Sequence, residues 1–506
     1  MWGLPFFVAV EWLACYGHRL LLFIIWFMTQ MDLRQVFELQ HQASRAQVET
    51  PLVVRRERLL RMQKLLDEHG GVLAAAVQAD FGMRSPRLTE MLDLFVTRKL
   101  LKHVLAHLAR WSRRQKVATP LMLMPGKAWI ERQPLGVVGV ISPWNYPVQL
   151  ALGPAITAMA AGNRVMLKPS ELTPHTSAQL AALISQFFAP EEFAVIEGDV
   201  SVATQFAGLS FDHLVFTGST SVGRRVAQAA AAHLTPTTLE LGGKSPCILG
   251  EDCDLEDAAL KIAHGKLINA GQTCIAPDYV LLPRGQEMAF AQAFRQAAQK
   301  LFPSFAGNAD YASILTKRHF ARLRQMLHQA QGMGARVEWM EDGSKSAAAG
   351  SQSAWGDAVE RQMVPALVFD ATAQMQLMQE EIFGPILPVI SYERLDDVIH
   401  AINAGPRPLA LYWFGRDEKV RDAVLSKTVS GGVSINDTLM HFAHDNLPFG
   451  GVGDSGWGAY HSEQGFVRFS HQKAVFVQSR WSAASLLYPP YGPKFDNVMA
   501  LLKRWL

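Results

Sequence analysis

Two residues capable of covalent chemistry lie thirty-four positions apart in this chain. Cys274 ends the segment NAGQTC, and Glu240 lies in the segment LELGGK. A thiol can supply a nucleophile and a carboxylate can supply a general base. The glycines beside each of them let another group approach the backbone closely. Because a free cysteine is more often a small buried hydrophobic residue, the pair alone does not establish an active site.

Two further segments combine a strand end with groups that suit a nucleotide. FTGSTSVG, at 216–223, leaves an expected strand and opens an expected helix, whose first amides would attract a phosphate. It is not the GxGxxG fingerprint, and a tight turn explains it equally well. Lys168 and Glu171, in LKPSE, follow another strand and could bind ribose hydroxyls. Taken alone, they would be a surface lysine and a helix-start glutamate.

A third segment, SPWNYP at 142–147, also follows a strand. Its prolines and aromatic residues make a stiff loop, from which Asn145 can present amide N–H groups to a developing oxyanion. Taken alone, an asparagine in a loop is more often a turn residue or a helix cap.

These segments occur together and in order, and with them the sequence resembles the aldehyde dehydrogenase superfamily from about residue 35 to 480. The resemblance also includes EEIFGP at 380–385, Asn436, and PFGG at 448–451. Two stretches, 273–279 and 439–461, resemble the class 3 group, which includes fatty, aromatic and coniferyl aldehyde dehydrogenases.

The resemblance implies a role for each matching residue. Cys274 would attack the aldehyde carbonyl, and Asn145 with the backbone N–H of Cys274 would hold the oxyanion. Hydride transfer to a nicotinamide would leave a thioester, which water activated by Glu240 would hydrolyse. Asn436 and the PFGG segment would close the substrate side. The residues expected to bind the cofactor are Trp144, Lys168, Glu171, Gly218, Ser219, Gly223, Leu241, Glu381 and Phe383.

The expected function is therefore the oxidation of an aldehyde to its carboxylic acid with NAD or NADP. By kinship the aldehyde is hydrophobic, either long-chain or aromatic, such as coniferyl aldehyde. The carboxylate of Glu171 would repel a 2′-phosphate, which mildly favours NAD. Transfer of the acyl group to coenzyme A, simple esterase action and a non-catalytic scaffold are the alternatives, and the presence of Glu240, the cofactor segments and Asn145 argues against them.

Composition supports an ordinary globular enzyme. The 506 residues are 49% hydrophobic and 18% charged with a net charge of +3, which indicates two or three domains and no nucleic-acid partner. The arginines 55, 56, 58 and 61 are expected on a solvated helix face. Four cysteines without CxxC spacing predict neither a disulfide framework nor a metal site, and they suit a reducing, cytoplasmic location.

The pattern of elements predicts an α/β fold. Helical spacing runs from about 35 to 114, with a helix end at Gly70-Gly71, and strands then alternate with helices in two regions, 136–246 and 246–433. Such alternation indicates parallel sheets covered by helices. A hairpin is expected at 119–133, with Pro125-Gly126 as its turn.

Together with the resemblance, this pattern predicts two Rossmann-like domains plus a small β oligomerisation element. The NAD(P)-binding domain would comprise 32–118 and 134–244, and the catalytic domain 245–446. The oligomerisation element would comprise 119–133 and 466–480, which implies a homodimer. The tail, 481–506, contains an amphipathic stretch from 495 that is expected to pack as a terminal helix.

The amino-terminal residues 1–31 are strongly apolar, but Glu11 and Arg19 interrupt them. The uncharged stretch 20–31 is shorter than the ~20 residues that span a bilayer. Three interpretations stay open: an upstream translation extension with Met31 as the start, a membrane anchor or interfacial segment, and a segment packed on the protein. Residues 341–360, rich in Gly, Ser and Ala, are expected to form a surface loop.

Overall fold

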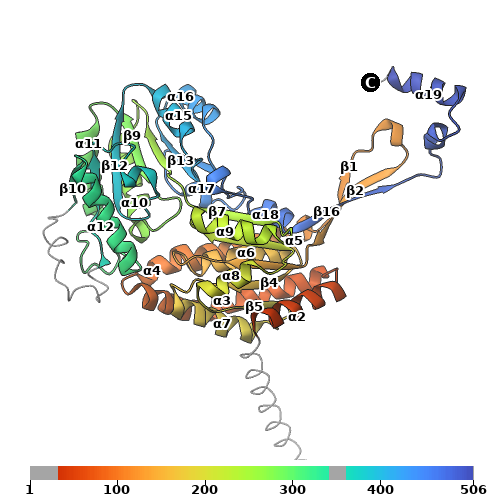
Figure 1. Cartoon of the computed structure of the whole chain (residues 1–506), viewed down its shortest axis with the longest axis horizontal. Coiled ribbons are helices and arrows are strands. Elements are labelled where there is room, and N and C mark those ends of the chain that lie inside the picture. Colours follow the sequence, from red (N-terminus) through yellow and green to blue (C-terminus); the bar gives the residue numbers. More distant parts are fainter. Residues whose placement is uncertain (1–31, 341–360, 505–506) are drawn as a thin grey trace, which may run out of the picture.

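Two large sheets covered by helices form the body of the molecule, and a small third sheet projects from it (Figure 1). The computed structural model describes residues 32–340 and 361–504. The interpretations of residues 1–31 and the expected loop at 341–360 lie outside these ranges. Within them, no helix combines the length and the apolar character needed to cross a membrane.

The first sheet has six strands in the order β15-β7-β6-β3-β4-β5, and only the edge pair β15 and β7 is antiparallel. Its strands are β3 (Val137–Ile141), β4 (Arg164–Lys168), β5 (Phe193–Val195), β6 (His213–Gly218), β7 (Thr237–Leu241) and β15 (Gly456–Trp457). From β3 the chain proceeds to β4 and β5 on one side and to β6 and β7 on the other. The carboxyl ends of β3 and β6 therefore form the kind of switch point where open α/β sheets bind ligands.

Helices cover both faces of this sheet because its strands alternate apolar side chains between the faces. Val138 and Val140 of β3 join one core cluster, and Val137 and Ile141 join the other. One layer contains α3 (Leu52–Phe81), α5 (Val96–Trp111), α6 (Gln149–Ala160) and α7 (Pro174–Phe187), and the other contains α2 (Leu33–Ala46), α8 (Val200–Ala207) and α9 (Thr220–Ala231). Every residue of α6 is buried, as its uniformly apolar sequence requires.

The second sheet has seven strands in the order β10-β11-β12-β9-β8-β13-β14, with only β10 antiparallel to its neighbour. Its strands are β8 (Pro246–Leu249), β9 (Tyr279–Pro283), β10 (Arg336–Trp339), β11 (Ala366–Phe369), β12 (Ile386–Tyr392), β13 (Ala410–Phe414) and β14 (Gly432–Ile435). The accompanying helices are α10 (Leu255–Leu267), α11 (Glu287–Leu301), α12 (Lys317–Gly332), α14 (Gln376–Gln379), α15 (Leu395–Ala404), α16 (Glu418–Lys427), α17 (Met440–Ala443) and, returning to the first sheet, α18 (Ser462–Arg468). The α/β fold class is thus confirmed.

The third sheet is antiparallel and consists of β1 (Gln115–Val117), β2 (Lys127–Pro134) and β16 (Ser470–Val477). The expected hairpin at 119–133 was misplaced, since its first strand lies earlier. Pro120 and Pro125 lie between the strands, and a proline cannot donate a ladder hydrogen bond, so the connection forms a short 3-10 turn at Leu121–Leu123 instead.

Three further expectations were wrong. Helix α3 does not end at Gly70-Gly71 but continues to Phe81, and Gly82 follows it with φ +81°. A Cβ at Gly70 would lie 2.4 Å from a guanidinium nitrogen of Arg98, so this glycine permits close packing against α5.

The arginine cluster is not a solvated face, because Arg55 and Arg58 are buried. Arg55 donates to the carbonyl of Thr50 at 2.8 Å, and Arg58 pairs with Glu192 at 3.0 Å.

The terminal helix α19 (Pro493–Lys503) has no buried residue and lies away from the body, near the projecting sheet (Figure 1). It therefore does not pack on the body of its own chain.

Candidate active site

Loops from both large sheets deliver the expected catalytic side chains. Asn145 lies in the loop after β3, at the switch point of the first sheet, and Glu240 lies in β7 of the same sheet. Cys274 follows α10 and a short 3-10 turn (Ile268–Gly271) of the second sheet. The nucleophile and the other two groups therefore depend on different sheets, and contacts between the loops must hold them together.

The loop before Cys274 has an unusual backbone. Asn269, Ala270 and Gly271 have φ values of +50°, +53° and +75°, in the left-handed region that disfavours most residues. A Cβ at Gly271 would lie 2.4 Å from the carbonyl oxygen of Gly384, so only glycine allows this approach. Strain of this kind collects at functional sites, where the surrounding structure maintains it.

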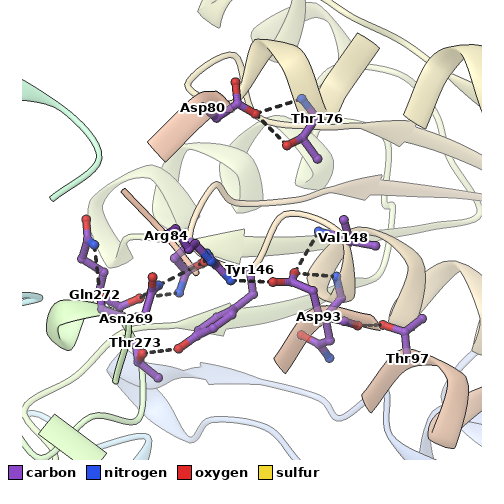
Figure 2. Close-up of polar contacts among 12 residues, drawn as sticks. Asp80, Arg84, Asp93, Thr97, Tyr146, Val148, Thr176, Asn269, Gln272 and Thr273 are labelled. Atoms are coloured by element: carbon purple, nitrogen blue, oxygen red, sulfur yellow. Dashed lines mark hydrogen bonds and ion pairs between the residues drawn. The ribbon is translucent and has the colours of Figure 1, made fainter. Parts of the chain in front are cut away.

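Direct hydrogen bonds join the Cys274 loop to the loop of Asn145 (Figure 2). The Nδ2 of Asn145 donates to the carbonyl of Gln272 at 3.2 Å, and the Nδ2 of Asn269 donates to the carbonyl of Asn145 at 3.1 Å. The hydroxyl groups of Tyr146 and Thr273 lie 2.6 Å apart. These bonds are buried, so they hold the amide of Asn145 beside the residues that precede Cys274.

Glu240 is buried without a polar partner. It is 3% exposed, and neither carboxylate oxygen is hydrogen-bonded by any described residue. Burial raises the pKa of this carboxyl group well above its usual range. The segment 448–451 passes beside it, since a Cβ at Gly450 would lie 3.2 Å from its Oε1.

The pKa of the Cys274 thiol shows which charges lie near it. Burial raises this pKa most, and the negative charges of Glu381 and Glu240 raise it further. The main-chain N–H groups of Cys274 and Ile275 act in the opposite direction, because they stabilise the thiolate. The fold therefore brings the thiol close to Glu240 and places backbone donors beside the sulfur.

The turn from β6 into α9 suits a phosphate. Gly218 ends β6 and Ser219 precedes α9, and no side chain caps the amides of the first turn of α9. Such amides and the helix dipole favour an anion. Gly223 lies in the first turn, and a Cβ there would meet the side chain of Leu241 at 2.5 Å, so α9 lies close against β7.

Lys168 and Glu171 lie at the carboxyl end of β4, beside the switch point. The buried ammonium of Lys168 donates to the carbonyl of Pro169 at 2.7 Å and lies 3.9 Å from the carboxylate of Glu171. Burial lowers the pKa of Lys168, and Glu171 counteracts this. Both side chains are placed where they could hold the hydroxyls of a ribose.

Glu381, Phe383 and Trp144 form a second group of expected cofactor residues. The rings of Trp144 and Phe383 meet edge to face, with centroids 5.4 Å apart. The carboxylate of Glu381 lies against Gly242, where a Cβ would be 1.8 Å from its Oε2. Burial and then Asp278 raise the pKa of Glu381 to about 8. The donors and acceptors in these two groups fit a dinucleotide that has two riboses and a flat ring.

The sequence profile of the aldehyde dehydrogenase family matches residues 25–475. The chain belongs to the aldehyde dehydrogenase family. It is 44% identical over 453 residues to a coniferyl aldehyde dehydrogenase of a Pseudomonas species, which covers 89% of this chain and 92% of that protein. It is 38% identical over 460 residues to aldehyde dehydrogenase family 3 member A2 of Mus musculus, which covers 90% and 91%.

Among solved structures, the substrate-bound state of Staphylococcus aureus AldH superposes with a TM-score of 0.85 at 36% identity, covering 94% of this chain and all of that one. These likenesses confirm the predicted family, its class 3 group and the fold of this aldehyde dehydrogenase.

In this aldehyde dehydrogenase, the side chain of Asn436, which was expected on the substrate side, bonds to a neighbouring loop. Its Oδ1 accepts from the N–H of Gly415 at 2.9 Å and its Nδ2 donates to the carbonyl of the same residue at 3.1 Å. Both ends of the amide thus hold the loop after β13.

The dehydrogenase also uses side chains that the sequence reasoning missed. Lys244 forms an ion pair with Asp278, which accepts the N–H of Ile382 at 3.0 Å and so fixes the residue after Glu381. His319 stacks on Trp144 with ring centroids 5.0 Å apart. Lys244 belongs to the LELGGK segment and Asp278 to the stretch after Cys274, so both had a signal in the sequence, whereas His319 had none.

A small cavity of about 20 Å³, room for a single water, lies at the start of α6, and neither Asn145, Glu240 nor Cys274 lines it. Its lining combines an ion pair at 3.0 Å between Lys99 and Asp445 with the rings of Phe442 and His461. Phe442 and His461 also pack against each other, with centroids 5.0 Å apart. The cavity therefore has aromatic walls and a charged pair.

Proposed function

We propose that this chain oxidises a hydrophobic aldehyde to its carboxylic acid with NAD or NADP, through a thioester on Cys274 that water hydrolyses with the help of Glu240. One observation supports this above all. The thiol loop is hydrogen-bonded to the loop of Asn145, while Glu240 is buried with neither carboxylate oxygen bonded by any described residue.

In the first step the thiol of Cys274 gives its proton to solvent, and the sulfur attacks the aldehyde carbon as a thiolate. The carbonyl oxygen becomes an oxyanion, for which the Nδ2 of Asn145 and the main-chain N–H of Cys274 are the donors. Donors that are already in place cost no reorganisation when the charge develops. The buried bonds between the two loops supply that order.

When bound, NAD or NADP would supply a nicotinamide as the hydride acceptor, and loss of hydride from the tetrahedral carbon would leave a thioester on Cys274. Trp144, Glu381 and Phe383 would hold the nicotinamide ring and its ribose, and Lys168 and Glu171 would hold the second ribose. Gly218, Ser219, Gly223 and Leu241 would border the pyrophosphate. Glu171 is a carboxylate at the sheet edge where a 2′-phosphate would lie, so NAD is the preferred cofactor.

In the second step Glu240 takes a proton from water, which attacks the thioester and releases the acid and the thiol. A carboxylate can act this way only if its oxygens are not committed elsewhere, and no described residue bonds them. This argues for hydrolysis rather than transfer of the acyl group to coenzyme A.

For the substrate we propose an aromatic aldehyde such as coniferyl aldehyde. The curated relative that is 44% identical carries that substrate in its name.

The test follows reduced cofactor with purified protein, NAD or NADP, and matched panels of cinnamyl, benzyl and long-chain aliphatic aldehydes. The product is identified as free acid or, with coenzyme A present, as the thioester. We expect the largest kcat/KM with a cinnamyl aldehyde and NAD, and free acid as the product. Reduced cofactor with no aldehyde would refute the reaction, and a clear preference for aliphatic chains would refute only the substrate.

A further inference from the structure

Asp93 lies in an interruption of the helical run between α4 (Pro86–Thr89) and α5. Residues Glu90–Phe95 form a π-helical turn, a rare form that is found frequently at functional sites. The hydroxyl of Thr97 donates a hydrogen bond to the main-chain carbonyl of Asp93 at 2.5 Å, which supports the widened turn. The turn delivers the side chain of Asp93 to the interior, where it is fully buried.

There, Asp93 forms an ion pair with Arg84 at 2.5 Å, and both side chains are 0% exposed (Figure 2). The pair holds both ends of the segment that contains the oxyanion donor. The Nη1 of Arg84 donates to the main-chain carbonyl of Asn145 at 2.7 Å. The Oδ1 of Asp93 accepts the N–H groups of Val148 and Gln149 at 3.1 and 3.2 Å.

Stability does not explain why this pair is buried. Removing two charges from water is expensive, and apolar residues of similar volume often replace such a pair without loss. The guanidinium also lies 5.2 Å from the ring centre of Tyr146, whose hydroxyl contacts Thr273. The pair therefore connects, through one residue on each side, to the backbone of Asn145 and to the loop of Cys274.

We propose that Arg84 and Asp93 are positioning residues, which fix the peptide of Asn145 and the start of α6 so that the amide of Asn145 meets the developing oxyanion. The inference rests on the proposed function. A small displacement of a catalytic donor can cost on the order of 10²-fold in rate, and removal of one oxyanion donor costs ~10²–10³-fold. Neither Arg84 nor Asp93 touches the reacting atoms, so they act through Asn145.

The test variant is Arg84→Met/Asp93→Leu, which removes both charges together and leaves no unpaired charge. We expect a folded protein in which kcat falls about 10²-fold. The KM for NAD and the rate of Cys274 alkylation by iodoacetamide should stay near those of the unmodified protein, because neither depends on the oxyanion donor. The single variant Arg84→Lys keeps the positive charge but not the two separate guanidinium N–H groups that bond Asn145 and Asp93. Its kcat should fall less than that of the double variant.

The control is Arg58→Met/Glu192→Leu, which removes another ion pair, with side chains 4% and 17% exposed, on α3 and before β5. Arg61 also pairs with Glu192, at 2.8 Å, and keeps Glu57 at 3.0 Å in this variant. The control should lower the melting temperature without changing kcat. The same double change at 84 and 93 is then made in an Asn145→Ala background. If the pair acts through Asn145, it should have little further effect on kcat there.

Hydrogen–deuterium exchange of residues 143–149 gives a readout that does not depend on turnover. Exchange at Val148 and Gln149 should quicken in Arg84→Met/Asp93→Leu and not in the control. A kcat equal to that of the control, or a full additional loss in the Asn145→Ala background, would overturn the inference. If the unmodified protein oxidised no aldehyde, the proposed function would fail, while unchanged exchange in this segment would separately refute the positioning role.

Discussion

At the scale of single residues, Cys274 and Glu240 differ in the step that each should control. In the proposed mechanism the thiol forms the covalent intermediate and the carboxylate activates the water that releases it. Burial raises the pKa of both groups, and the charges of Glu381 and Glu240 raise that of the thiol further, so both groups favour their neutral forms. Each should therefore fail in its own way when it is replaced.

Replacing Cys274 should abolish turnover. Cys274→Ala removes the nucleophile, so neither a burst nor steady formation of reduced cofactor is expected with any aldehyde. Cys253→Ala is the matched control, because that cysteine is partly exposed and lies beside Asp252 and Asp254 rather than near Glu240. Near-native activity of Cys274→Ala would rule out the assignment of the nucleophile.

Replacing Glu240 should separate the two steps. Glu240→Gln should keep a burst of reduced cofactor but slow steady turnover on the order of 10²-fold, within the usual contribution of a general base. Since burial raises the pKa of Glu240, its carboxylate form requires higher pH. Steady turnover of the unmodified protein should then rise with pH well above the ordinary range of a carboxyl group.

Stopped-flow and steady-state measurements across pH check both parts of this prediction. In Glu240→Gln the limb of the profile that Glu240 controls should disappear. Steady turnover equal to that of the unmodified protein would exclude Glu240 as the base.

At the scale of elements, close approaches of backbone define the site. Gly450 lies beside Glu240, and a Cβ there would be 2.0 Å from the carbonyl of Gly458. Gly271 meets Gly384 in the same manner on the opposite side of the site. Loops around the site therefore approach each other at positions where a side chain would separate them.

Adding a methyl group at Gly450 should consequently displace the segment beside the base. Gly450→Ala should lower both the melting temperature and kcat, because Gly458 has no flexible side chain that could move aside. Gly71→Ala is the control, since that glycine lies inside α3 with nothing within 4 Å of the added carbon. It should be stabilising by roughly 0.5–1 kcal/mol, from helix propensity alone. Thermal melts and initial rates compare the two variants, and equal behaviour would contradict the packing argument.

The elements of the two large sheets could be predicted from the sequence because apolar periodicity and strand–helix alternation are local signals. The errors have a common physical cause in contacts that are distant in sequence. The sequence alone suggests a helix end at Gly70, because it does not show that the side chain of Arg98 packs over this glycine. The site residues 145, 240 and 274 lie in dense motifs. Arg84 and Asp93 lie in none, and an arginine and an aspartate nine positions apart indicate nothing until the π-turn brings them together.

At the scale of the whole molecule, the projecting sheet and tail expose more apolar surface than a lone chain would favour. Leu121, Met122 and Trp481 are 74%, 61% and 89% exposed, and Phe476 is 44% exposed. Contiguous apolar patches of this kind mark interaction sites. We propose that a second copy of the chain covers them.

Light scattering coupled to size-exclusion chromatography should therefore give the mass of a dimer. Leu121→Glu/Phe476→Glu should shift the protein towards the monomer, since charges in a buried interface are costly. Val53→Glu is the control, because Val53 is 72% exposed on the body of the molecule at the start of α3. A monomer without substitutions, or a dimer that the double variant leaves intact, would refute this interface.

Glu240 is buried without a hydrogen-bond partner, and this implies a trade-off between activity and thermal stability. A buried polar group without a hydrogen bond costs about 1–3 kcal/mol of stability, so the protein is less stable than its fold allows. Because the folded state raises the pKa of this acid, the free energy of unfolding decreases as pH rises from the pKa of the unfolded chain through the higher pKa of the folded protein. Glu240→Leu should accordingly melt at a higher temperature than the active protein, most clearly at alkaline pH. Selection for heat tolerance alone would thus remove the residue that we propose releases the product.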